Sequence, residues 1–496
     1  MGSAIQQEAT ALGRSTILFI DWRDIRCGKL EWHTSEGEHF GVANPPGSQV
    51  PLHAHPRQVP HGIRLEAQPA TTEGPVEGWK GWGRSIYDGG CYRSWHFEIN
   101  GHTKLGSGSA AHATEYDSIY VCGAASEDGF AWREVSRSRV EVTSQRGFDG
   151  ASFFIDPAAP PQERYKVVYC ARFPEGEYDE MVRAYLERPF RHRDSRLTWE
   201  QRYGLYIMVS PDGENWKSVN QPFMLHPSDT DTNVLWDEGL GKYVMYTRMF
   251  ENDRRWIGRT EADDFFDWEP VAPLIWPRLD EPPDHDYYLN GYTRYPQLSE
   301  YQLMFPMVYH RFTERSHVQL FASSDGMVWN EVPGGPVFEP GEPGTWDSEF
   351  LGSGKDLMPF GPDRIAIPYT GIPYPHKYPR WQTVWDTWNM GWASWPKDRI
   401  CAVVAEGEGE FWTQPVVPAG GRIRLNYRAP VAGEIRLGIE GVEGRSAADC
   451  DPLTGDEAER LVTWGGEADL RVPEGQALVL HVRMRSARLF SVYFTS

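Results

Sequence analysis

The sequence predicts an all-β protein, a five-bladed β-propeller followed by a β-sandwich, and three observations lead to this prediction. The first is composition: 21 Trp, 23 Tyr and 22 Phe stand beside 49 Gly and 38 Pro in 496 residues. Aromatic residues favour strands, whereas Gly and Pro interrupt strands with turns. The second observation is a repeated turn motif, and the third is a repeated hairpin pattern.

The repeated turn has the pattern Ser-x-Asp-Gly-x-x-Trp. It occurs as SEDGFAW at 126–132, SPDGENW at 210–216 and SSDGMVW at 323–329, with a diverged copy, TEADDFFDW, at 260–268. The Asp can accept hydrogen bonds from backbone N–H groups of the turn, and the Gly tolerates a positive φ. The motif resembles the Asp-box of β-propellers, so we expect its Trp to pack between sheets. These residues are Trp132, Trp216 and Trp329.

Five segments repeat the pattern of a strand, a turn and an aromatic-rich strand. They start at residues 85, 153, 234, 294 and 356, at spacings of 68, 81, 60 and 62 residues. Each of the first four is followed by a copy of the turn motif, so an inner and an outer hairpin form one four-stranded blade. Five units predict five blades, because seven blades would need units of ~50 residues.

Two further segments complete the predicted propeller. We expect the early strand ILFID, at 17–21, to pair into the last blade and close the ring. The long second spacing contains a polar, charge-dense insertion, 174–204, which we expect to form a short helix. The propeller is predicted to span residues 1–400.

The chain changes character after residue 400. The segments 422–441 and 477–494 alternate apolar and polar residues, and the turn motif no longer occurs. Period-two alternation with Gly-rich turns predicts an antiparallel β-sandwich over 401–496. We expect this module to have a structural role first and carbohydrate binding second.

Charge and cysteine content exclude several classes of function. A net charge of -21 disfavours nucleic acid and anionic membranes as partners. The six Cys form neither a disulfide framework nor a CxxC metal motif. The sequence indicates no cofactor and no metal; an axial Ca²⁺ is possible in a propeller but is not indicated. No segment resembles a signal peptide or a membrane span, so we expect a cytoplasmic protein. Nothing in the sequence predicts an oligomeric state.

Acidic residues recur just before the predicted inner strands. Any one of them could simply cap a turn, but equivalent positions in five blades would converge on one pocket. Like charges held close cannot all ionise freely, so one pKa should rise and supply an acid beside a base. Aromatic side chains accompany them and suit the C–H faces of sugar rings. The acids are Glu77, Asp149, Asp229, Asp231, Asp284, Asp286, Asp347 and Glu349, and the aromatics are Trp79, Trp82, Tyr287, Tyr288, Tyr292 and Trp346.

Five blades, acids before the inner strands and a trailing sandwich resemble the furanosidase-type glycoside hydrolases of families 32, 43 and 68. The resemblance implies a hydrolase acting on an oligo- or polysaccharide. Those families carry Asp, Asp and Glu in the first three blades, where this chain has Glu77, Asp149 and Asp231. Two of the three residue types therefore differ, and the local signature motifs of those families are missing.

The resulting hypothesis is the two-carboxylate scheme, in which one acid protonates the leaving oxygen and a carboxylate activates water or attacks. We predict Asp149, Asp231 and Glu349 as the catalytic acids, with Glu349 carrying the raised pKa. Because Glu349 lies in a blade not adjacent to that of Asp231, we expect a wide separation and inversion at the anomeric carbon. The predicted substrate-binding residues are Glu77, Trp79, Arg84, Arg248, Asp286, Tyr292, Arg294 and Asp347.

Two other functions remain open at this point. A propeller polysaccharide lyase could use His and Tyr on a uronate, and the stretch PLHAHPRQVPH, with His53, His55 and His61, is joined in this reading by Tyr309 and His310. His-x-His can also hold a metal on one strand face, although a Pro-rich stretch favours a solvated loop. A carbohydrate-binding protein without catalysis is the third hypothesis. A lyase product absorbs in the ultraviolet, a hydrolase product is a plain reducing sugar, and a lectin yields neither.

Overall fold

The chain divides into two compact units in the computed structural model. Unit 1 contains Met1–Gln68, Val332–Gly334 and Pro396–Ser496, and unit 2 contains Pro69–Glu331 and Gly335–Trp395. The residues that the structure describes are 13–34, 39–40, 52–80, 85–103, 114–141, 149–172, 176–187, 203–226, 228–230, 232–251, 253–376 and 388–496. The last segment of unit 1 begins at Pro396, and the domain boundary at residue 400 stays a prediction. The first 68 residues, however, group with that C-terminal segment instead of with the propeller.

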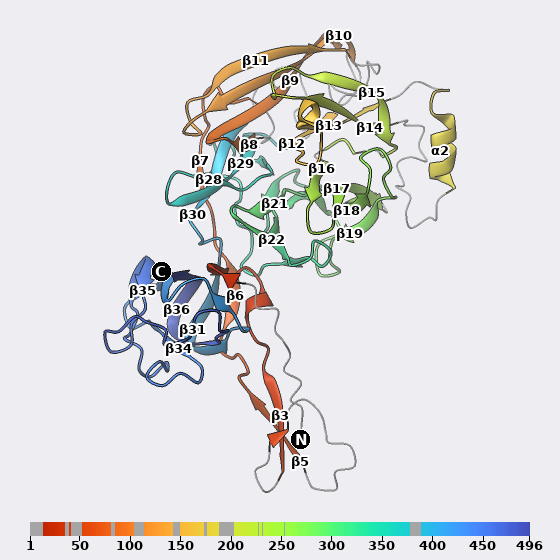
Figure 1. Cartoon of the computed structure of the whole chain (residues 1–496). Coiled ribbons are helices and arrows are strands. Elements are labelled where there is room, and N and C mark those ends of the chain that lie inside the picture. Colours follow the sequence, from red (N-terminus) through yellow and green to blue (C-terminus); the bar gives the residue numbers. More distant parts are fainter. Residues whose placement is uncertain are drawn as a thin grey trace. The chain divides into compact units, whose positions relative to one another are not determined.

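Unit 2 is built of antiparallel sheets, which we number along the chain (Figure 1). Sheet 1 contains β8 (Ser85–Asp88), β9 (Cys91–Thr103), β10 (Thr114–Ser126) and β11 (Arg133–Val140). Sheet 2 contains β12 (Asp149–Ile155), β13 (Tyr165–Arg172), β14 (Tyr203–Ser210) and β15 (Lys217–Met224). Sheet 3 contains β16 (Asn233–Asp237), β17 (Lys242–Glu251), β18 (Arg254–Ala262) and β19 (Ala272–Ile275).

Sheets 4 and 5 follow the same order with local changes. Sheet 4 contains β21 (Tyr292–Tyr295), β22 (Leu298–Met304), β25 (Phe321–Ser323) and β26 (Asn330–Glu331). We count with it a separate three-stranded sheet made of β20 (His285–Leu289), β23 (Met307–His310) and β24 (Ser316–Val318). Sheet 5 contains β27 (Phe350–Ser353), β28 (Met358–Phe360), β29 (Arg364–Ile372), β30 (Asn389–Pro396) and β7 (Thr71–Glu73). The all-β prediction is confirmed, and a sheet lies at each predicted inner hairpin.

The repeated turns have the predicted geometry. In the copy at 210–216, Asp212 Oδ1 accepts the backbone N–H groups of Glu214 and Asn215, each at 2.8 Å. Gly213 has φ +78°, and its carbonyl oxygen accepts the indole N–H of Trp216 at 3.0 Å. The same backbone and indole bonds occur in the copies at 126–132 and 323–329. The predicted packing role of these Trp residues is confirmed.

The turns also connect neighbouring sheets. The carbonyl oxygen of Gly213 in sheet 2 accepts a second indole N–H, from Trp95 of sheet 1, at 2.7 Å. The equivalent carbonyl of Gly129 in sheet 1 accepts the indole N–H of Trp392 from sheet 5 at 2.9 Å. The last sheet in sequence is therefore bonded to the first, as in a closed propeller.

Polar side chains on the inner strands join the remaining sheets. Ser152 of sheet 2 donates to Asn233 of sheet 3 at 3.0 Å, and Asn233 donates to Asn290, which lies between β20 and β21, at 2.5 Å. Ser353 of sheet 5 donates to the carbonyl oxygen of Phe305 in sheet 4 at 2.7 Å. These bonds connect sheets 2, 3, 4 and 5 in sheet order.

The strand that completes sheet 5 is not the predicted one. β7 pairs with β30, with Glu73 opposite Trp392. The segment 17–21 instead contributes β2 (Thr16–Leu18), which pairs with β36 of unit 1. Four consecutive apolar residues explain this placement, because Ile17, Leu18, Phe19 and Ile20 are all at most 2% exposed and fill the core of unit 1.

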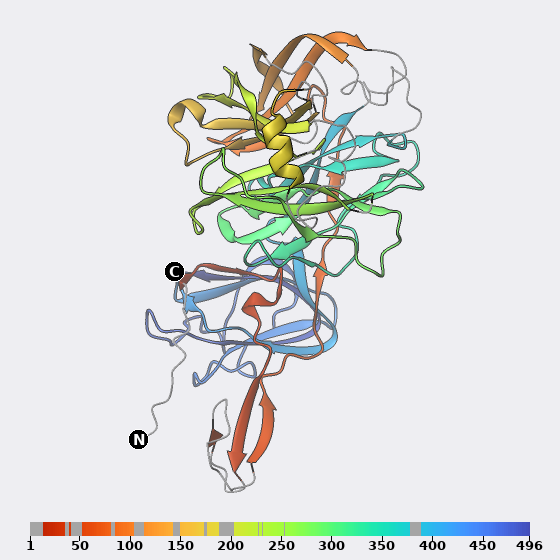
Figure 2. The same ribbon diagram turned by 90° about the vertical axis from the view of Figure 1, so that its right-hand side faces the viewer.

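Unit 1 is organised by one long strand, β36 (Leu480–Thr495), which pairs with four others. Red N-terminal and blue C-terminal segments lie side by side within this unit (Figure 2). The partners of β36 are β2, β31 (Cys401–Trp412), β33 (Arg422–Ala429) and β34 (Glu434–Ile439). β6 (Arg64–Ala67) extends the sheet beside β31, and β35 (Gly455–Leu461) extends it beside β33. The antiparallel β structure predicted after residue 400 is therefore present.

Smaller elements complete the described chain. A separate three-stranded sheet contains β3 (Lys29–Thr34), β4 (His39–Phe40) and β5 (Leu52–Arg57), and β1 (Gly13–Arg14) pairs with β32 (Val417–Pro418). Two 3₁₀ turns are η1 (Trp22–Asp24) and η2 (Pro161–Glu163). The predicted short helix in the insertion of sheet 2 is present as α2 (Asp179–Leu186). Among the described residues, no helix is long and apolar enough to cross a membrane.

Candidate active site

The first residues of the inner strands carry the predicted acids, and the structure describes some of them. Asp149 begins β12, but its side chain lies outside the described residues, as do Asp231 and Arg84. Asp229, which precedes β16, and Glu349, which precedes β27, are described. Both carboxylates are partly exposed, with side-chain exposures of 21% and 33%.

A buried arginine holds Asp229. The side chain of Arg248, on β17, is 1% exposed, and its Nη1 donates to Asp229 Oδ1 at 2.5 Å. Its Nη2 donates to the carbonyl oxygen of Tyr288 at 2.7 Å. A buried guanidinium needs a counter-charge and hydrogen-bond acceptors, and Asp229 supplies the charge. The predicted site residue Arg248 therefore orients a carboxylate that remains accessible to solvent.

Aromatic rings lie beside this ion pair. The guanidinium carbon of Arg248 is 4.0 Å from the centroid of the Tyr288 ring, and that of Arg255 is 4.8 Å from it. The Tyr288 hydroxyl is hydrogen-bonded to Nε2 of His376 at 2.9 Å. The His376 ring in turn stacks on Phe350, the first residue of β27, with centroids 4.4 Å apart.

Glu349 comes from the same end of sheet 5. Its backbone N–H donates to the carbonyl oxygen of Ile372, and its Oε2 lies 3.3 Å from Nε of Arg315. The predicted role of Glu349 as the proton donor stays a prediction.

These contacts join residues of sheets 3, 4 and 5 into one group, which we call the strand-start cluster. Each member touches the next, from the carboxylate of Asp229 to that of Glu349. The cluster consists of Asp229, Arg248, Tyr288, His376, Phe350 and Glu349. The two ends of this series of contacts are the partly exposed carboxylates of Asp229 and Glu349.

Asp286 has a structural role in place of the predicted contact with substrate. Its side chain is fully buried, and its Oδ2 accepts Arg255 Nη1 at 2.7 Å and Arg311 Nε at 2.8 Å. Burial lowers the pKa of Arg255, but the neighbouring Tyr288, Asp286 and Asp229 groups outweigh burial and raise it. Asp286 thus neutralises the arginines that support the cluster.

Three more predicted binding residues are buried in packing contacts. Trp79, 4% exposed, stacks on Trp132 with centroids 4.8 Å apart, and Tyr292, 6% exposed, stacks on Tyr246 at 4.4 Å. Asp347, 4% exposed, accepts the hydroxyl of Tyr369 at 2.8 Å. Buried rings and a saturated carboxylate cannot reach a sugar, so these assignments are corrected.

Two further predicted residues lie outside the cluster. Arg294 binds Asp237 at 2.6 Å and the hydroxyl of Tyr292 at 3.2 Å. Asp237 is the last residue of β16, at the end of that strand away from Asp229. Glu77 is exposed in a turn before β8. Neither residue has a described contact with the strand-start cluster.

The histidine-rich stretch belongs to unit 1, whereas the strand-start cluster belongs to unit 2. His53 and His55 are on β5 of unit 1, and their side chains lie outside the described residues. His61 is exposed, with Nε2 3.7 Å from Glu410. Within the described ranges, no group of three or more His, Cys, Asp or Glu side chains could hold a metal ion.

Sequence patterns did not identify three residues that form or support the site. His376 lies in a Pro-rich loop, PYPHKYP, that has no repeat counterpart. Arg255 and Arg311 are bonded to Asp286 from two different strand ends. They come together only because β18 of sheet 3 lies against β20, which pairs with β23, so no motif could have identified them.

Comparisons with solved structures find similar folds at low identity. A thermostable family-43 glycoside hydrolase is 11% identical, with a TM-score of 0.42, over 67% of this chain and 96% of that one. A family-62 α-L-arabinofuranosidase catalytic domain from Coprinopsis cinerea is 10% identical, with a TM-score of 0.39, over 67% and 98%. A β-1,2-mannobiose phosphorylase from Listeria innocua is 11% identical, with a TM-score of 0.42, over 68% and 92%.

No protein-family model and no curated protein sequence matches the chain. At these identities and TM-scores, the activity has to be argued from the side chains of the site itself.

Proposed function

We propose that the protein hydrolyses a glycosidic bond in an oligo- or polysaccharide, and that the reaction takes place at the strand-start cluster. One observation carries this proposal: two accessible carboxylates, Asp229 and Glu349, are joined through buried arginine and aromatic contacts from three sheets. Glycosidases need a pair of carboxyl groups on either side of the scissile bond. Aromatic surfaces beside them can pack against the apolar face of a sugar ring.

Asp229 fits the role of the group that stays ionised. Its contact with the buried Arg248 stabilises the carboxylate, and its side chain, 21% exposed, can be reached by water or a substrate. In the hydrolytic step, this carboxylate would accept a proton from the attacking water, while a second carboxyl gives a proton to the leaving oxygen. The products are a new reducing end and a free hydroxyl group.

Asp149 and Asp231 remain proposed acids of the same site. Gly150 approaches the loop before β16 so closely that a Cβ there would lie 2.5 Å from the carbonyl oxygen of Thr230. The backbone beside Asp149 is therefore adjacent to the backbone between Asp229 and Asp231. This proximity supports a site to which sheets 2, 3 and 5 each contribute a carboxyl group.

The stereochemical outcome follows from the separation of the two acids. If Glu349 donates the proton across the cluster, the acids are separated by enough space for a water molecule, and the reaction inverts the anomeric carbon. Following the first anomer formed by proton NMR tests this pairing. A product with retained configuration would exclude Glu349 as the partner of the carboxylates in sheets 2 and 3.

A specific observation also favours a second candidate, a lyase that acts on a uronate. The hydrogen bond between Tyr288 and His376, with two guanidinium groups against the Tyr288 ring, is a base and acid pair beside positive charge. A lyase removes the proton beside the uronate carboxyl group and releases the sugar oxygen as a hydroxyl. Its product carries a new C=C bond and absorbs in the ultraviolet.

One assay separates these candidates. The full chain is incubated with xylan, arabinan, mannan, polygalacturonate and alginate, and both reducing ends and ultraviolet absorbance are measured. Reducing ends without absorbance support the hydrolase, whereas the two together support the lyase. If every substrate is bound without either signal, the chain is a binding protein and both catalytic proposals are wrong.

A further inference from the structure

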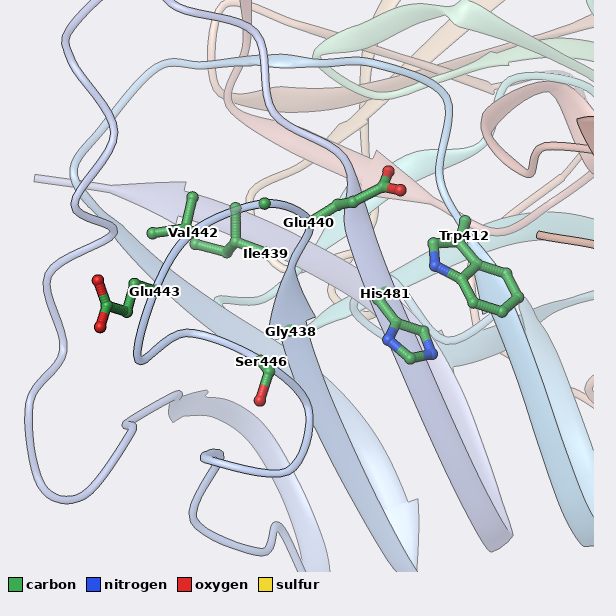
Figure 3. A pocket seen from close by; sticks show the side chains of 9 residues that line it. Trp412, Gly438, Ile439, Glu440, Val442, Glu443, Ser446 and His481 are labelled. Atoms are coloured by element: carbon green, nitrogen blue, oxygen red, sulfur yellow. The ribbon is translucent and has the colours of Figure 1, made fainter. Parts of the chain in front are cut away.

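Unit 1 contains a pocket of about 460 Å³ that the proposed catalytic function does not use. It is lined by the end of β31, the start of β36, and the loop that follows β34. Figure 3 shows Trp412 and His481 on one side of this pocket and Val442 and Glu443 on the other. All of these residues belong to unit 1.

Two paired rings form an aromatic wall. Trp412 and His481 are direct partners in the β31–β36 register, and their rings stack with centroids 4.4 Å apart and planes 6° apart. Nε2 of His481 is also hydrogen-bonded to Glu410, two residues before Trp412. The strand register and this contact fix the orientation of both rings, so the wall is preformed.

The opposite wall is a loop held by a buried arginine. The side chain of Arg445 is 2% exposed, and its Nε and Nη2 both donate to Asp469, each at 2.6 Å. Its guanidinium carbon lies 5.2 Å from the centroid of the Trp464 ring. The backbone N–H of Ile439 closes the loop by donating to the carbonyl oxygen of Arg445 at 2.7 Å. These bonds keep the pocket open without a ligand.

The charged side chains that line the pocket indicate which class of ligand it can bind. Glu440 and Glu443 line the pocket, and no Lys or Arg among the described residues does. The Glu440 side chain is 43% exposed and is oriented by Gln58 and by Arg26, whose Nη1 is 4.0 Å from its Oε2. Carboxylates accept hydrogen bonds from hydroxyl groups and repel uronates, sulfates and phosphates. An uncharged ligand with one apolar face and several hydroxyl groups fits both walls.

We propose that this pocket binds a neutral sugar unit, with the sugar ring against the Trp412–His481 wall and hydroxyl groups donating to Glu440. The site is separate from the strand-start cluster and does not depend on the reaction that the cluster carries out. It gives unit 1 a carbohydrate-binding role, which would hold a polymer on the protein whether or not that polymer is cleaved.

Calorimetric titration of the full chain tests this proposal. The probes are cellohexaose, xylohexaose and mannohexaose as neutral ligands, a chitosan hexamer as an amine and oligogalacturonate as an anion. We expect at least one neutral hexasaccharide to bind, and Trp412→Ala to weaken that binding at least tenfold. Trp276→Ala, which removes an indole that is 54% exposed in unit 2, should leave it unchanged.

A second variant keeps the test decisive if Trp412→Ala lowers the melting temperature. Glu440→Gln keeps the shape of the side chain and removes its charge. It should weaken binding of the neutral hexasaccharide by a smaller factor than Trp412→Ala does. The proposal is overturned if no neutral hexasaccharide binds or if both variants bind as tightly as the parent. Tighter binding of the amine or of oligogalacturonate would overturn the assignment to neutral sugars. Because binding is measured directly, loss of hydrolysis in other variants does not affect the result.

Discussion

Asp212 in the outer turn of sheet 2 and Asp229 at the start of sheet 3 both accept hydrogen bonds, but from different sources. Asp212 is bonded by residues two and three positions further along the chain. Asp229 is bonded by Arg248, nineteen positions away and on the next strand. The turns are therefore satisfied locally and can repeat, whereas each site residue depends on its own sheet neighbours. Contacts that repeat from sheet to sheet therefore belong to structural residues, whereas the candidate catalytic residues have contacts that do not repeat.

The electrostatics of the turn agree with this distinction. Burial raises the pKa of Asp212, but hydrogen bonds from Asn215, Glu214 and Ser210 outweigh burial and lower it to about 2. A carboxyl group with a lowered pKa contributes stability above its unfolded value and loses it as the pH falls. The charged Asp212 carboxylate therefore stabilises the turn, and its hydrogen bonds within the turn give it a structural role.

The largest expected effect is on turnover at the strand starts. Asp149→Asn and Asp231→Asn should each lower kcat by about 10²–10⁴-fold, as loss of a general acid or base does. Initial rates on the substrate found for the parent measure this effect. Melting temperatures should stay close to the parent value, since both changes conserve shape. Full activity in both variants would remove these residues from the site.

The next largest expected effect is a loss of stability when a contact between neighbouring sheets is removed, at a residue outside the candidate active site. Trp95→Ala removes a buried indole that bonds to Gly213 and stacks on Phe153 at 5.3 Å. Replacing a buried Trp by Ala costs about 3–5 kcal/mol. Chemical denaturation measures the free energy of unfolding, and Trp276→Ala is the control because that indole is 54% exposed. Equal effects of the two changes would contradict the packing role of Trp95.

A smaller loss is expected in the turn itself. Asp212→Ala removes the acceptor of two backbone N–H groups and should cost about 1 kcal/mol, in the range of helix-cap losses. Asp128→Ala and Asp325→Ala should cost similar amounts, and the three effects should add because the turns lie in different sheets. Urea denaturation of the single and triple variants checks this. Strong non-additivity would show that the turns do not act as independent local structures.

The smallest expected effect is a dependence of stability on pH from sheet 4. Burial, with nearby His310 and His285, lowers the pKa of His317 to about 4. The unfolded chain then binds a proton at higher pH than the folded chain does, so stability falls as the pH drops from about 6.5 towards 4. Melting temperatures across this range measure the effect, and His317→Gln should reduce the slope. An unchanged slope in the variant would assign the dependence to other groups.

The sequence predicted the parts of the fold that repeat. The Asp-type turns, the Trp packing and the sheet positions follow from local patterns that recur in four or five copies. The closing strand was missed because β7 is only three residues long, Thr71–Glu73, and pairs with a strand more than 300 residues later. The number of blades stays a prediction.

The sequence predicted where site residues lie along the chain more accurately than it predicted what each of them does. Residues before the inner strands include Asp229 and Glu349, but Asp286 and Asp347 occupy similar positions and are buried. Sequence position cannot tell these pairs apart, because exposure depends on which arginine or tyrosine lies opposite. His376 was missed for the same reason, since only its contacts with Tyr288 and Phe350 place it in the site.

One measurement tests the central claim most directly, because a similar ion pair lies near each end of β16. Asp229 binds Arg248 at 2.5 Å at the start of β16, and Asp237 binds Arg294 at 2.6 Å at its end. Asp229→Asn should lower kcat by at least about 10²-fold on a glycan that the parent cleaves. Asp237→Asn should have the same kcat as the parent. Both melting temperatures are measured on the same samples. Equal turnover in the two variants, with both folded, would contradict the assignment of the chemistry to the strand-start cluster.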